Sequence, residues 1–212
     1  MTEPVSPRLR NAILGLLALV TIASLAGTAL SPYLLVKSPL LLVAISPAAH
    51  HVALAAATVD PVPLVTVSTL RRTLTSLAAF GLGALYGPAA VSFIEQRYPR
   101  LARLVALLER LFARFGVLLL IAAPVPTVAV LAGAARSRLV HFLPAVVVGL
   151  TLWTSLTYTV GDALSRWTDL LTAFLTEHLL ESTAVCVVLV VLRQSYLRFA
   201  KLRARLEDRS PQ

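Results

Sequence analysis

The chain has 212 residues, of which 58% are hydrophobic and 14% are charged. About a quarter of the residues in a soluble domain are charged, so this composition excludes a soluble domain and indicates an integral membrane protein. The net charge of +9 does not point to nucleic acid here, because basic residues that flank apolar runs act as topology signals and as contacts to anionic lipid. The single cysteine, Cys186, excludes a disulfide framework and a cysteine-rich metal site.

The first apolar run follows a short polar start, residues 1–10, and extends without charge from Asn11 to Val36. A spanning helix needs about 20 apolar residues, so this run predicts an N-terminal membrane helix. A cleaved signal peptide is the alternative interpretation, but its apolar core has only about 7–15 residues. We therefore expect the helix to be retained.

The next apolar segment, Ser38–Val59, is interrupted by Pro39 and Pro47. Proline removes a backbone donor and clashes with the preceding turn, and polar backbone groups freed in lipid must find partners inside the protein. This pattern favours a re-entrant hairpin over a straight spanning helix. The segment ends in a proline-rich stretch that contains Asp60, Pro61 and Pro63.

A second spanning helix is predicted over Leu64–Ile94, which contains Arg71 and Arg72 and then a long uncharged stretch. Small residues along this stretch would let another helix approach closely and would permit a homo-oligomer. These small residues are Ala79, Gly81, Gly83, Ala84 and Gly87.

Residues 95–114 alternate arginine and glutamate with leucine at helical spacing, which predicts an amphipathic helix on the membrane surface. A second proline-broken apolar run follows Gly116, and its breaks are Pro124 and Pro126. We predict a second re-entrant hairpin here, packed against a third spanning helix over Val140–Gly161.

The C-terminal part predicts one more interfacial helix, Asp162–Glu181, and one more spanning helix, Ser182–Ala200. Arginine dominates residues 95–114 but occurs only once among several acids in 162–181. By the positive-inside rule the first segment is cytoplasmic and the second external. Both termini are then cytoplasmic, as residues 1–10 and as a tail of residues 201–212, and residues 11–200 form one membrane domain.

The predicted fold is therefore all-α: an inverted repeat of two re-entrant hairpins, each followed by a spanning helix, with further spanning helices at the two ends of the chain and interfacial amphipathic helices. Repeats of this kind are a known transporter plan, with the binding site near the middle of the membrane.

Several motifs of the chain resemble the DedA/VTT membrane family, also called SNARE-associated Golgi proteins. Phe112-x-x-x-Gly116 looks like the entry to that family's second re-entrant loop. The stretch SPAAHHVALAAATVDPVPLVTVSTLRR resembles the first re-entrant loop of a divergent actinobacterial branch. Phe80-x-Leu82-Gly83-Ala84-x-x-Gly87 looks like its Y-x-L-G-R-x-x-G box. The A-G…F…G…W…G spacing of the family is matched without a gap by Ala132, Gly133, Phe142, Gly149, Trp153 and Gly161.

The resemblance covers about residues 38–165 and implies a bacterial inner-membrane protein with proton-coupled lipid handling. The chain departs from the family at charged positions. Ala84 stands where the family box has arginine, and Asp60 is the nearest substitute for the usual acidic residue of the first loop. Many members have an arginine beside the second-loop proline, where this chain has Ala122, Ala123 and Val128.

The charged residues near the first break are candidate site residues, because ionisable groups at membrane depth usually pair or line a cavity. Asp60, Arg71 and Arg72 predict a binding site for an anionic headgroup, with Asp60 as a proton carrier. A structural ion pair between Asp60 and Arg71 is the alternative. His50 and His51 are candidates for the same proton relay, with interfacial or hydrogen-bonded structural histidines as the alternative. Adjacent histidines do not share the helix face that one metal would need.

Near the second break, Arg136 and Arg138 are candidate phosphate ligands, with positive-inside anchors as the alternative. No GxSxG, HExxH or P-loop motif occurs, so the sequence predicts neither an enzyme nor a cofactor or metal. Close helix packing is predicted at Gly83, Gly87, Gly116, Gly133, Gly149 and Gly161.

Together with the resemblance, these residues predict a membrane protein that moves a lipid or lipid-linked anion, such as a polyprenyl phosphate, across the bacterial inner membrane. Its expected partners are membrane lipids and no nucleic acid. Two alternatives remain open: a proton-coupled transporter of ions or small solutes, and a non-transporting membrane scaffold for envelope integrity.

Overall fold

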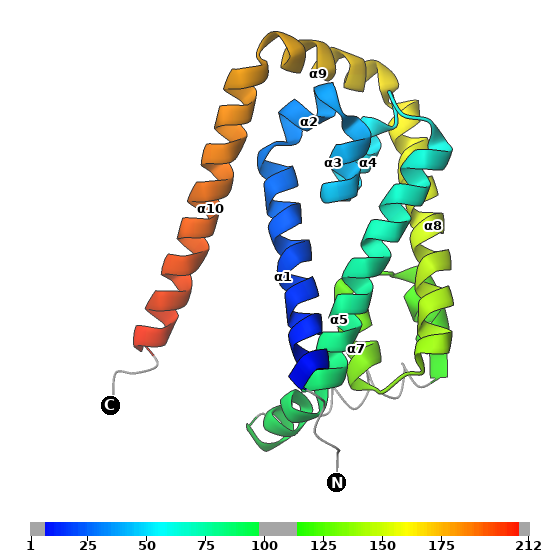
Figure 1. Ribbon diagram of the computed structural model, residues 1–212, viewed down its shortest axis with the longest axis vertical. Helices are drawn as coiled ribbons and strands as arrows, with labels where there is room; N and C mark the ends of the chain where they lie inside the picture. Colours follow the sequence, from blue (N-terminus) through cyan, green and yellow to red (C-terminus); the bar gives the residue numbers. More distant parts are fainter. Residues whose placement is uncertain (1–6, 98–113, 208–212) are drawn as a thin grey trace.

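The computed structural model describes residues 7–97 and 114–207, and these residues contain helices and no strands. Four long helices run alternately up and down the molecule, with α1 beginning and α10 ending at the same end (Figure 1). A shorter helix, α9, crosses the opposite end between α8 and α10 (Figure 1). The long helices are α1 (Pro7–Ala29), α5 (Pro61–Arg97), α8 (Leu139–Ala163) and α10 (Leu179–Glu207), and α9 is Ser165–Glu177.

Three helices are long and apolar enough to cross a membrane, namely Pro7–Ala29, Leu139–Ala163 and Leu179–Leu197 among the described residues. This finding supports a membrane protein. The N-terminal helix differs from the prediction, because it ends at Ala29 and the chain resumes as α2, Ser31–Lys37. Pro32 in the first turn of α2 explains the interruption, since proline fits a helix start and not its interior.

Short helices fill both ends of the molecule. At the α9 end, α2 is followed by α3 (Pro39–Ile45) and α4 (Ala49–Ala55), and the last two form a helix–break–helix unit that we call the first hairpin. At the opposite end, helical residues 114–122 and α7 (Pro126–Ala134) form a second such unit, the second hairpin. The two hairpins therefore enter the molecule from opposite ends (Figure 1).

The break in each hairpin has the same backbone hydrogen bond around its proline. The amide of Ala48 donates to Ser46 O across Pro47 at 2.8 Å, and the amide of Val125 donates to Ala123 O at 2.8 Å. A bond between residues two apart defines a γ-turn. The breaks predicted at Pro47 and Pro124 thus lie at equivalent positions of two similar units.

The other prolines predicted as breaks stand at helix starts. Pro39, Pro61 and Pro126 are the first residues of α3, α5 and α7, and Pro63 lies in the first turn of α5. The missing amide hydrogen of proline has no partner to lose in a first turn. These prolines therefore mark where a helix begins after a break and are compatible with the helix that follows.

The second arm of each hairpin packs against the long helix of the other half of the chain. A Cβ added to Gly161 of α8 would collide with the backbone of Ala53 in α4. Likewise, a Cβ on Gly83 of α5 would collide with the backbone of Val130 in α7, and one on Gly133 with Phe80 O. The absence of side chains lets these backbones touch, so the second arm of each hairpin is held by the half to which it does not belong.

Apolar side chains fill the space around these contacts in separate clusters. The largest lies between α5, the second hairpin and α8, with Phe142 and Leu150 almost completely buried. A smaller cluster joins the first hairpin to α5 through Val43, Val52 and Leu64. The core of the described part thus lies around the hairpins, whereas the long helices keep outward apolar faces.

Several predicted segments have different limits in the structure. The surface helix predicted for residues 95–114 lies largely outside the described residues, as does Phe112. The predicted interfacial helix begins only at Ser165, because α8 continues to Ala163. The last helix begins at Leu179 and continues to Glu207, into the segment predicted as the polar tail.

Candidate functional site

Arg71 of α5 is half-buried and joins three parts of the fold. Its Nη2 donates to Val20 O of α1 at 3.0 Å, to Ile45 O of the first hairpin at 3.3 Å and to Ser24 Oγ at 3.4 Å. Its Nη1 donates to Thr75 Oγ1 at 3.0 Å. All these acceptors are neutral, so Arg71 orders the end of the first hairpin, and no carboxylate among the described residues compensates its positive charge.

Arg72 is also half-buried but faces a different helix. Its Nη1 donates to Thr154 Oγ1 of α8 at 3.4 Å, a long hydrogen bond, and Thr154 is completely buried. A guanidinium group has five N–H donors. Within the described residues Arg72 has this one hydrogen-bond partner and no carboxylate, which leaves most of its donors available to a ligand.

Two buried hydroxyl groups of α5 lack a hydrogen-bond partner within the described residues, and they are Ser68 Oγ and Thr69 Oγ1. Residues three or four apart share one face of a helix, which places Ser68 beside Arg71 and Arg72. Buried polar groups without partners are uncommon and each needs an explanation. We call Ser68, Thr69, Arg71, Arg72 and Thr154 the interior site, a cationic patch with unused donors.

The two histidines of the first hairpin have different environments. His51 is 2% exposed, and its Nδ1 lies 2.8 Å from Ser46 O, the acceptor of the γ-turn. His50 is exposed. Their rings pack edge to face with centroids 4.2 Å apart. His51 therefore stabilises the break, and the described residues contain no cluster of three potential metal ligands.

The structure does not bring Asp60 to Arg71. Asp60 is exposed and stands just before α5, with its carbonyl accepting from Leu64 N at 3.3 Å. With a rise of 1.5 Å per residue, Arg71 lies roughly 16 Å further along the helix. The sequence pattern suggested a pair because both residues flank the first break, but the regular helix between them holds them apart.

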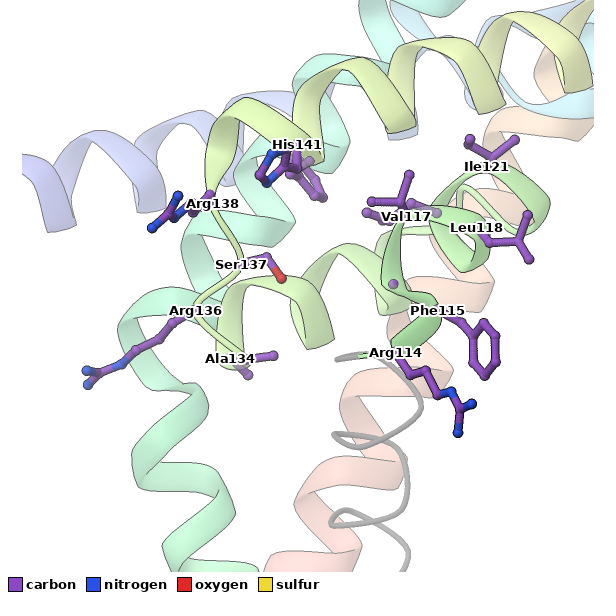
Figure 2. Close-up of a pocket in the computed structure, with 14 residues that line it drawn as sticks. Arg114, Phe115, Val117, Leu118, Ile121, Ala134, Arg136, Ser137, Arg138 and His141 are labelled. Atoms are coloured by element: carbon purple, nitrogen blue, oxygen red, sulfur yellow. The ribbon is translucent and has the colours of Figure 1, made fainter.

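The remaining predicted arginines, Arg136 and Arg138, lie in the connection between α7 and α8, at the end opposite Asp60 (Figure 1). They line a cavity of about 820 Å³ together with Arg114 and His141 (Figure 2). The five residues predicted as one headgroup site therefore divide: Arg71 and Arg72 belong to the interior site, Arg136 and Arg138 to this cavity, and Asp60 to neither.

Arg136 has a backbone φ of 53°, in the left-handed region. It follows α7 and forms the bonds of a helix-ending motif in which Ser137 N donates to Ala132 O at 3.1 Å. Glycine usually occupies this position because it has no Cβ. Among the described residues Arg136 is the one non-glycine residue with such a φ.

Sequence reasoning missed the hydroxyl residues of the interior site. Ser68 lies three and four residues before Arg71 and Arg72, and Thr69 lies three residues before Arg72, so this pattern was available in the sequence. Thr154 could not be found in this way, because nothing in the sequence shows which residue of α8 faces Arg72.

Comparisons with protein-family models, with curated proteins and with solved structures find no match to this chain.

Proposed function

We propose that the chain is a bacterial inner-membrane transport protein that moves a lipid or lipid-linked anion, such as a polyprenyl phosphate, with the interior site as the place where the anionic group passes. The observation that carries this proposal is the pair of half-buried guanidinium groups, Arg71 and Arg72, without a carboxylate partner in the described residues. The proposal assigns no catalytic step and no cofactor to the chain.

The energetics of buried charge support an anionic ligand. A charge removed from water without compensation is costly, and buried charges are normally paired. Arg71 has neutral acceptors only, and Arg72 has one long hydrogen bond to Thr154. A phosphate group would supply the missing countercharge and accept bidentate bonds from a guanidinium.

The proposed membrane arrangement places both hairpins as re-entrant elements, with the α9 end outside and the opposite end in the cytoplasm. Three apolar helices of spanning length and the entry of the hairpins from opposite ends support it (Figure 1). In transporters of this kind, broken helices meet at the binding site near the middle of the membrane. The contact of Arg71 with Ile45 O joins α5 to the break of the first hairpin in the same way.

The test is the transbilayer movement of labelled polyprenyl phosphate and of an ordinary labelled phospholipid in proteoliposomes. We expect wild-type protein to move lipid, and Arg71→Ala or Arg72→Ala to slow it more than about ten-fold, because hydrogen bonds to charged groups contribute about 1.5–3 kcal/mol. Arg166→Ala removes an exposed arginine of α9 and serves as the matched control.

Other outcomes would replace the proposal. Proton flux that depends on an added small solute and is lost in Asp60→Asn would indicate the proton-coupled solute transporter. If folded wild-type protein moves neither lipid nor protons, the scaffold hypothesis is the one that remains. The scaffold hypothesis also predicts that both arginine variants support envelope integrity in cells.

A further inference from the structure

We infer that the cavity between the second hairpin and the start of α8 is a separate binding site for the phosphate headgroup of an anionic lipid. The cavity has a volume of about 820 Å³, within the range of about 300–1,000 Å³ that is typical of ligand sites. Helical residues 114–122 form one wall, and the α7–α8 connection with the start of α8 forms the other (Figure 2).

The charge of the cavity lining is positive throughout. Arg114 belongs to the first arm of the second hairpin and Arg136 and Arg138 to the α7–α8 connection, and no aspartate or glutamate is among the described residues of the lining. None of the three arginines has an ion-pair partner within the described residues, although Arg114 lies 5.6 Å from the ring centroid of Phe115. Arginines at the edge of a cavity attract an anion, and guanidinium groups match the geometry of phosphate in particular.

The interior of the cavity is suited to an amphiphile. Figure 2 shows the side chains of Arg136 and Arg138 extending outward on one side of the cavity and that of Arg114 outward on the other, while Ser137 and His141 lie nearer its middle. Ser137 and His141 would contact a phosphate directly, while the arginines at the edge supply charge and reach it along flexible stems. Apolar side chains that include Val117 and Phe142 complete the lining, where the first carbons of a lipid would pack.

The position of the cavity fits the same ligand. The elements that line the cavity, helical residues 114–122 and the α7–α8 connection, lie at the end of the molecule where α1 begins, opposite α9 (Figure 1). Under the proposed topology this end faces the cytoplasm, where anionic lipids attract basic segments.

Arg136 provides an independent argument. The left-handed region strains a residue that has a Cβ, and Arg136 adopts this conformation at the end of α7. A glycine here would relieve the strain. The chain instead places a cation at the cavity, and lipid binding gives that cation a use.

The inference is tested by equilibrium binding to the purified full-length protein in detergent, which does not depend on transport. The probes are dihexanoyl phosphatidic acid, dihexanoyl phosphatidylcholine and inorganic phosphate, measured by isothermal titration calorimetry. We expect phosphatidic acid to bind at least about ten-fold more tightly than either other probe, since it alone combines an exposed phosphate with apolar chains. Phosphatidylcholine carries its phosphate as a zwitterionic diester, so equal affinity for it would overturn the assignment of an anionic-headgroup site. Equal affinity for inorganic phosphate would overturn the lipid assignment.

Variants assign the binding to this cavity. Arg136→Gly should weaken phosphatidic acid binding by about five-fold or more, as expected for one lost charge-assisted contact, and should also raise the melting temperature. Loss of binding in a stabilised protein cannot result from unfolding. Arg136→Ala combined with Arg138→Ala should weaken binding further, whereas Arg136→Lys should retain much of it and Arg166→Ala all of it.

Wild-type affinity in both the Arg136→Gly and the double-alanine variants would overturn the site. The proposed function has a separate readout: protein that binds phosphatidic acid but moves no lipid would refute transport and leave the cavity site intact. Wild-type protein that moves lipid but binds no phosphatidic acid would refute the cavity site and leave the proposed function intact.

Discussion

The two hairpins have the same backbone design and different chemistry. In each, a proline γ-turn separates two short helices, and a side chain from the long helix that follows donates to the last carbonyl of the first arm. Arg71 donates to Ile45 O at 3.3 Å in the first hairpin, and Trp153 Nε1 donates to Ala122 O at 2.8 Å in the second. A neutral indole therefore meets the same structural requirement that a guanidinium meets elsewhere.

This difference shows which features belong to the fold and which are additional. The broken backbone needs a hydrogen-bond donor in both hairpins, but the second hairpin shows that the donor need not be charged. Ser46 and His51 of the first hairpin correspond in position to Ala123 and Val128 of the second hairpin. The positive charge of Arg71 thus exceeds what the hairpin requires, which is why we assign it to ligand binding.

The largest expected effect comes from the glycines that hold the second arms. Gly133→Ala and Gly161→Ala should each destabilise the protein by about 3 kcal/mol or more, because the new Cβ meets backbone atoms that cannot move aside. Thermal unfolding followed by circular dichroism measures the change, and Gly15→Ala is the control, since nothing lies within 4 Å of its added Cβ. A large effect at only one of the two glycines would break the structural equivalence of the hairpins.

A smaller loss of stability is expected when either donor to a hairpin carbonyl, Arg71 or Trp153, is replaced, and only one of the two replacements should reduce lipid movement. Arg71→Gln and Trp153→Phe each remove contacts to a hairpin carbonyl and should cost about 1 kcal/mol of unfolding free energy. Lipid movement should fall strongly in Arg71→Gln and stay close to wild type in Trp153→Phe. Equal loss of activity in the two variants would mean that both hairpins act only through their shape.

The smallest expected effect concerns the histidine of the first hairpin. His51→Val gives the first hairpin the side chain of Val128 and removes the bond from Nδ1 to Ser46 O. We expect a loss of about 0.5 kcal/mol, the low end for one hydrogen bond, because Ser46 O keeps the amide of Ala48 as its donor. Unfolding by a chemical denaturant measures the loss. Val128→Ala, at the equivalent position of the second hairpin, is the comparison variant. A gain in stability would show that His51 is retained for a reason other than folding.

The parts of the fold that follow from local chemistry could be predicted from the sequence. The helix predicted over Val140–Gly161 corresponds closely to α8, because its apolar run is uninterrupted by charge. The breaks at Pro47 and Pro124 follow from the missing amide hydrogen of proline. Small residues between α5 and α7 indicated close packing, and the structure places Gly83 and Gly133 at backbone contacts.

The site could be predicted less well, because spacing along a helix does not show what stands opposite it. Arg71 and Arg72 are neighbours in sequence, yet one contacts α1 and the first hairpin and the other contacts Thr154 of α8. Asp60 was near the same break in sequence but is separated from both by two or more turns of helix. The division of the predicted arginines into two sites likewise depends on tertiary arrangement alone.

The exchange of hairpin arms has a mechanical consequence. Because Gly161 holds α4 against α8 while Gly83 and Gly133 hold α7 against α5, the natural rigid bodies combine pieces of both sequence repeats. Rocking one repeat as a unit against the other would separate these backbone contacts and would be opposed by them. Under the proposed function, a motion that admits a lipid must carry the second arm of each hairpin along with the long helix of the opposite half, so the moving parts would differ from the two halves that the sequence predicts as repeats.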